Sequence, residues 1–327
     1  MRILTAIVLS LALVSSGAEA ATQRQTKATT KAAPALQFEK SEHVLKWIND
    51  YRSAPDADRL PEVVKAMGDL GLFREVDNAG VYIGFMAGVL GSNPDKAEKL
   101  VGKMFPMPPE DQVILIKAIA FSGLEEWKKL LGNFNERMPA RVVLIRKYLY
   151  GDGKTLDQLP LDDGSFALDA HWGYFFATGS SVPVRNILKV LVWSTDKDNV
   201  EKLTLGSMAK WTLATNATRD KELLDILKAE LNTQPKAVTG PLREVIDAAE
   251  TFETSRIRKQ ALASIEQLKA KGPQSNRDVS WWGQAGQTVL ALGCVAAGAM
   301  GQVQVGIPCV IGGALSSAAV KFLTPQP

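Results

Sequence analysis

The stretch KELLDILKAEL at residues 221–231 decides the fold class, because its leucines recur at three- and four-residue spacings. This spacing places them on one face of an α-helix. The same period returns in a second stripe, formed by Ile257, Leu262, Ile265 and Leu268. From residue 41 to residue 271 the alternation typical of strands is scarce, so we predict an all-α body over this range.

Short breaks rich in Gly, Pro and Asn divide this body into helices, at residues 92–94, 106–109, 151–153 and 239–241. Four apolar stretches end in a residue that tolerates a positive φ, and these residues are Gly91, Gly123, Gly179 and Asn216. We expect each of them to close a helix. Pro94 and Pro183 then fall where the following helix could begin.

The four turns are separated by 32, 56 and 37 residues, and two of these spacings are close to the period of helix-turn-helix repeats. Over residues 80–231 the chain resembles the tetratricopeptide or Sel1-like class of stacked helical hairpins. The signature Trp, Tyr and Pro positions of that class do not recur in register here. The resemblance implies an irregular, α-solenoid-like body that binds a protein or peptide partner. A generic irregular α-helical domain is the alternative.

The N-terminus predicts export. Arg2 is followed by an apolar run over residues 3–14, and Ala18 and Ala20 are the small residues that a signal peptidase reads. We expect a signal peptide over residues 1–20 and a periplasmic or extracellular location. Residues 21–40 are then a flexible basic leader, followed by the helical-repeat-like domain over 41–271 and a linker over 272–280.

Catalytic and metal-binding motifs are scarce in this chain. His43 and His171 are its only histidines, and neither HExxH nor CxxC occurs. His171 could pair with Asp169, but a packed histidine is the more common reading. The sequence GDGKT at residues 151–155 lacks the first glycine of a phosphate-binding loop and predicts a helix end. We expect no catalytic residue, no cofactor and no metal site.

The formal net charge of +3 is too small and too evenly spread to favour nucleic acid as a partner.

Residues 281–327 form an apolar, Gly/Ala-rich segment that we expect to fold into a hairpin. The midpoint between Cys294 and Cys309 falls between Gly301 and Gln302, inside the polar interruption at residues 301–306. An even cysteine count in an exported protein favours a disulfide, so we predict that these two cysteines are bonded.

This hairpin could pack on the body, or it could contact a membrane or a partner. Each arm would span roughly 20 Å, which is short of the hydrocarbon core of about 30 Å. The aromatic pair and the small residues are typical of membrane interfaces and close helix contacts. The predicted contact residues are Trp281, Trp282, Gly293, Ala297, Gly301, Gly312 and Gly313.

Three functions remain open from the sequence. The first is an exported, non-enzymatic helical protein that binds or scaffolds a protein or peptide partner, with membrane contact through residues 281–327. The second is membrane insertion as the activity itself, in the manner of a pore-forming protein. The third is a hydrolase of envelope polymers, which a cleft lined by two acids, one with a raised pKa, would favour.

Overall fold

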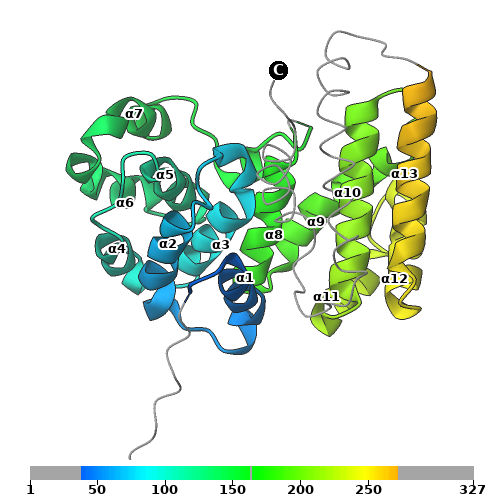
Figure 1. The fold of residues 1–327 in the computed structure, drawn as a ribbon, viewed down its shortest axis with the longest axis horizontal. Helices are drawn as coiled ribbons and strands as arrows, with labels where there is room; N and C mark the ends of the chain where they lie inside the picture. Colours follow the sequence, from blue (N-terminus) through cyan, green and yellow to red (C-terminus); the bar gives the residue numbers. More distant parts are fainter. Residues whose placement is uncertain (1–37, 163, 272–327) are drawn as a thin grey trace, which may run out of the picture. The chain divides into compact units, whose positions relative to one another are not determined.

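The computed structural model describes residues 38–162 and 164–271, and it confirms the all-α class (Figure 1). Within these ranges it contains thirteen α-helices and no strand. The helices are α1 Ser41–Asp50, α2 Leu60–Asp69, α3 Gly80–Gly91, α4 Pro94–Lys103, α5 Gln112–Phe121, α6 Trp127–Asn133, α7 Val142–Tyr150, α8 Phe166–Thr178, α9 Ser181–Val190, α10 Val200–Ala217, α11 Lys221–Glu230, α12 Lys236–Glu250 and α13 Thr254–Ala270. Short 3₁₀ turns join several of them, at η1 Tyr51–Ser53, η2 Ala57–Arg59, η3 Val76–Asn78, η4 Asn135–Arg137, η5 Pro139–Arg141, η6 Leu156–Gln158 and η7 Leu191–Thr195.

The predicted helix ends are partly confirmed. Gly123 and Gly179 are left-handed, with φ of 72° and 67°, and Gly179 follows α8 directly. Pro94 and Pro183 lie in the first turns of α4 and α9, as expected.

Gly91 is the last residue of α3, so it closes this helix as predicted, although it is not left-handed. A Cβ there would lie 2.1 Å from the carbonyl oxygen of Ser122. Two other predictions about helix ends were wrong. Asn216 lies inside α10. Residues 239–241 do not break the chain, since α12 continues through Pro241, whose missing N–H removes only one bond near the start of the helix.

Helices α3 and α8 form a parallel pair in the interior. Gly80 lies against the beginning of α8 at Phe166, and Gly88 lies against its end at Ala177. A Cβ on Gly84 would lie 1.9 Å from the carbonyl oxygen of Ala170, and one on Gly173 would lie 2.0 Å from that of Val81. The two backbones therefore touch directly, which only glycine permits at these positions. We call this pair, α3 with α8, the glycine core.

Helices α1 and α5 and the η1 turn pack on the glycine core. On the α1 side, the Trp47 ring packs edge-on against Phe85 of α3 at a centroid distance of 5.3 Å, and the Tyr51 ring does so at 5.2 Å. Helix α5 packs on α3 from another direction, and its own residues are almost all buried. Apolar burial on every side explains why α3 carries no charged residue.

Helix α10 forms a second packing centre, the α10 core, against η7, α12 and α13 (Figure 1). Unlike α3, it buries polar side chains along its length, namely Glu201, Thr204, Ser207, Lys210, Thr212 and Asn216. The two centres meet at a buried hydrogen bond of 3.1 Å, which Trp172 Nε1 donates to Thr212 Oγ1.

Arg52 ties the beginning of the described chain to the turn before α11. Its guanidinium donates to Glu222 at 2.6 Å, forms an ion pair with Asp220, and lies 4.6 Å from the centroid of the Phe175 ring. Asp220 also accepts from the Leu223 amide at 3.0 Å and so caps α11. One cation thus joins η1, α8 and α11.

Candidate functional site

A groove of about 850 Å³ lies between α2 and the segment that joins α4 to α5. We call it the α2–α5 groove. Its volume falls in the range of ligand pockets in proteins. Helix α2 contributes Val64 and Gly68 to one side, and residues 104–108 form the other side.

Residues 104–108, Met-Phe-Pro-Met-Pro, form an apolar wall. Contacts with neighbouring side chains hold this wall in place. The Phe105 ring stacks on Phe134 at a centroid distance of 5.7 Å, and the Arg137 guanidinium lies 4.2 Å from the Phe105 centroid. The Met107 carbonyl accepts from Gln112 Nε2 at 3.0 Å. A proline-rich wall fixed in this way needs little ordering when a ligand binds, which favours affinity.

Charged side chains of both signs line the same groove. The cations are Lys65, Arg74 and Lys103, and the carboxylates are Glu62, Asp69, Glu110 and Asp111. Burial, together with the charges of Glu110 and Asp69, raises the pKa of Asp111. Asp111 packs on α2 where the helix has no side chain, since a Cβ on Gly68 would lie 2.9 Å from Asp111 Oδ2.

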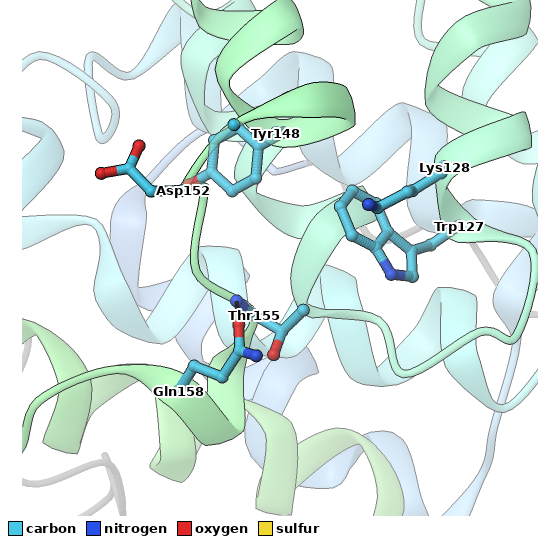
Figure 2. Close-up of a pocket in the computed structure, with 8 residues that line it drawn as sticks. Trp127, Lys128, Tyr148, Asp152, Thr155 and Gln158 are labelled. Atoms are coloured by element: carbon cyan, nitrogen blue, oxygen red, sulfur yellow. Dashed lines mark hydrogen bonds between the residues drawn. The ribbon is translucent and has the colours of Figure 1, made fainter.

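A second hollow, of about 480 Å³, lies between α6 and the loop after α7 (Figure 2). Figure 2 shows the Trp127 and Tyr148 rings facing the Thr155–Gln158 pair, in which the Thr155 amide donates to Gln158 Oε1 at 3.0 Å. The loop GDGKT borders this hollow. Its Gly151 and Gly153 amides both donate to the Lys147 carbonyl, at 3.0 and 3.1 Å, so they close α7 and leave no N–H cradle for a phosphate.

His171 and Asp169 both lie in the interior on α8. His171 is 2% exposed and Asp169 is 3% exposed. Burial lowers the pKa of His171 to about 4, with a further contribution from the Lys189 charge, and burial raises the pKa of Asp169. Asp169 Oδ1 and His171 Nδ1 lack a hydrogen-bond partner among the described residues, so these two atoms do not form the pair considered from the sequence.

The site residues predicted from the sequence lie outside the described residues. These are Cys294, Cys309, Trp281, Trp282, Gly293, Ala297, Gly301, Gly312 and Gly313. Their predicted disulfide and membrane or partner contacts stay predictions.

Within the described ranges, no cluster of three or more His, Cys, Asp or Glu side chains is arranged to hold a metal. None of the helices there is both long enough and apolar enough to cross a membrane.

Sequence reasoning missed the groove residues. The run at 106–109 was interpreted only as a break between helices, although the methionine among its prolines is an apolar residue in a surface loop. The acids of α2 are far apart in the sequence from Glu110 and Asp111, which precede α5, and only the fold brings them together. Comparisons with models of protein families, with curated proteins and with solved structures found no match.

Proposed function

We propose that this is an exported, non-enzymatic binding protein that holds an extended peptide segment of a partner in the α2–α5 groove. One observation carries the proposal: a preformed apolar wall at residues 104–108 lies beside cations and carboxylates in a hollow of about 850 Å³. An apolar side chain of the ligand would pack on Met104 and Met107. The binding role agrees with what the resemblance to helical-hairpin repeats implies.

The charged side chains of the groove restrict the class of ligand that it can bind. Lys65 and Lys103 can pair with an acidic residue of the peptide, and Glu62 and Glu110 can pair with a basic one. These four side chains are exposed, so each pair adds little affinity and mainly sets the direction of the peptide. Lys65 and Glu62 would then exchange their partners within the chain, Asp69 at 2.6 Å and Arg59 at 3.2 Å. The ligand class is therefore a short segment with an apolar centre and charges of opposite sign on either side.

Methionine methyl groups offer a direct test. The mature protein would be labelled with ¹³C at its methionine methyls and titrated with a pool of hexapeptides, each with a central leucine between one lysine and one glutamate. We expect the Met104 and Met107 signals to shift while those of Met86 and Met208, which lie outside the groove, stay in place. A pool with the charges replaced by serine should bind more weakly.

Two variants sharpen this test. Met107→Ser removes an apolar side chain from the wall and should weaken binding by about tenfold or more. Val143→Ser is the matched control, because Val143 is 85% exposed on α7, outside the groove. Unshifted Met104 and Met107 signals, or equal binding by Met107→Ser and the native protein, would contradict the proposal.

A hydrolase of envelope polymers is the second candidate, and one observation favours it. Asp111, whose pKa is raised, lines the groove together with Asp69 and Glu110, and glycoside hydrolysis uses one protonated and one ionised carboxyl group. Incubation with purified envelope glycan should then release soluble fragments, and Asp111→Asn should abolish the release. Peptide binding without any release of fragments would reject this candidate and leave the first in place.

A further inference from the structure

A third cavity lies apart from the α2–α5 groove, and it contains His171. Its volume is about 350 Å³, and it is bounded by η6 and the segment after it, by α8, by α9 and by η7. Its polar lining consists of Asp157, Asp162, His171, Asn186 and Lys189, and the Trp193 ring and two leucines complete it. A cavity of this size suits a small molecule rather than a peptide segment.

His171 gives this cavity a buried polar group without a partner. The side chain is 2% exposed, and its Nδ1 atom has no hydrogen-bond partner among the described residues. Buried polar atoms in folded proteins are nearly always hydrogen-bonded, and a molecule bound in this cavity would supply the partner that Nδ1 lacks. Because burial lowers its pKa to about 4, the imidazole is neutral at pH 7 and offers one donor and one acceptor.

Charges of opposite sign reach the cavity from different elements. Helix α9 supplies Lys189, whose Nζ donates to Asn186 Oδ1 at 2.7 Å. The Lys189 charge also acts on His171, which places the cation near the buried imidazole. The η6 turn supplies the carboxylate of Asp157, whose charge contributes to the raised pKa of Tyr174 on α8. A ligand that carries both a carboxylate and an ammonium group complements this arrangement.

We propose that the His171 cavity binds a small zwitterion, a free amino acid or a dipeptide with an apolar side chain. The carboxylate of the ligand pairs with Lys189 and Asn186, and its ammonium group pairs with Asp157. The apolar side chain packs on Trp193, and the ligand supplies a hydrogen bond to the His171 imidazole. This site is independent of the peptide groove, so either proposal can fail without the other.

The scarcity of histidine makes the test selective. The chain has two histidines, so ¹⁵N-imidazole NMR of the full mature protein gives one signal set for His171 and one for His43. Titration with leucine and with the dipeptide leucyl-alanine should shift the His171 signals and leave those of His43 unchanged. N-acetyl-leucine, which lacks the ammonium group, and leucinamide, which lacks the carboxylate, should bind at least about tenfold more weakly.

Surface variants test the charges without risk to the core. Lys189→Met and Asp157→Asn change exposed side chains and should each reduce leucine affinity at least about tenfold. Lys128→Met is the matched control, since Lys128 is exposed and lines the Trp127 hollow instead. The proposal is overturned if neither leucine nor leucyl-alanine shifts His171. It is also overturned if both single-charge analogues bind as leucine does, if Lys189→Met binds normally, or if glucose produces the same shift.

Discussion

The glycine core and the α10 core each bury a central helix, but they pack it in opposite ways. In the glycine core the backbones of α3 and α8 touch, and α3 buries apolar residues on every side. In the α10 core the central helix buries six polar residues, and Thr204 Oγ1 and Asn216 Nδ2 lack partners among the described residues. Direct backbone contact allows a single spacing of the helices, whereas a centre packed through side chains can adjust.

The two cores should also be sensitive to different kinds of substitution. A change of one methyl group should disrupt the glycine core, because no side-chain motion can relieve a clash between backbones. In the α10 core, the sensitive changes should be those that alter a hydrogen bond or a charge, since buried polar groups depend on their partners.

The largest expected effect follows from Gly84→Ala. The added Cβ would lie 1.9 Å from the Ala170 carbonyl oxygen, so α3 and α8 must separate. We expect a loss of about 3 kcal/mol or more in the free energy of unfolding, measured by denaturant titration.

The control for this variant is Gly132→Ala on α6. Apart from the adjoining residues and the backbone of α6, no atom lies within 4 Å of a Cβ at this exposed helical position. It should raise the free energy of unfolding by about 0.5–1 kcal/mol. Equal effects of the two substitutions would contradict the sensitivity assigned to the backbone contact in the glycine core.

Acid should reveal the protonation of His171, which is buried on α8 of the glycine core. The pKa of His171 is about 4 in the folded state, so the unfolded chain, with a histidine pKa near 6.5, takes up the proton first as the pH falls. Stability from this group is therefore complete above about pH 6.5 and is lost towards pH 4, by about 3 kcal/mol.

The measurement is the pH dependence of the free energy of unfolding for the native protein minus that of His171→Gln. The subtraction is needed because Asp169 acts in the opposite direction. Burial raises its pKa, so its contribution to stability is greatest at low pH and decreases as the pH rises. If this difference in the free energy of unfolding does not change between pH 7 and pH 4, His171 is not buried and neutral in the folded state.

In the α10 core, the charge of Lys210 should matter through its partner. Lys210 Nζ donates to Glu244 Oε2 at 2.6 Å, and the side chains are 11% and 52% exposed. Glu244→Gln leaves a largely buried cation without its counter-ion and should cost about 2 kcal/mol. Lys210→Met keeps the packing and frees Glu244 to reach water, so it should change stability by less than about 1 kcal/mol. A larger loss of stability in Lys210→Met than in Glu244→Gln would show that packing, not charge, dominates here.

The smallest effect is expected from Thr204→Val. Thr204 is fully buried and its hydroxyl has no partner among the described residues. An isosteric valine should raise the free energy of unfolding by up to about 1 kcal/mol. Thr212→Val is the matched control, because it removes the acceptor of Trp172 Nε1 and should cost about 1–2 kcal/mol. Two variants of equal stability would argue that α10 does not distinguish paired from unpaired hydroxyls.

Local features of this fold could be predicted from the sequence, and distant ones could not. The leucine period predicted α11, and the positive φ of Gly123 and Gly179 followed from residue type. The pairing of α3 with α8 could not be derived from periodicity, because a helix that is apolar all round does not indicate its neighbour. Glycines at every fourth position, 80, 84 and 88, are the signal of a close helix contact in this sequence.

The candidate site was hidden for the same reason. Val64 on one side, and Met107 and Asp111 on the other, belong to two segments that only the fold brings together, and none of them forms a motif. His171 was singled out by its rarity, but its missing hydrogen bond is a property of the packed structure. The predicted contacts of residues 281–327 stay predictions, since those residues lie outside the described ranges.

The parallel pairing of α3 with α8 has a further consequence during synthesis, because the chain is made from its N-terminus. Helix α3 is synthesised, and on export would be translocated, well before its partner at residues 166–178. At roughly 5–20 residues per second, a newly made α3 waits on the order of several seconds before the face that packs on α8 is covered. The native pair forms only after residue 178 has emerged, so this face of α3 is exposed to aggregation during the interval.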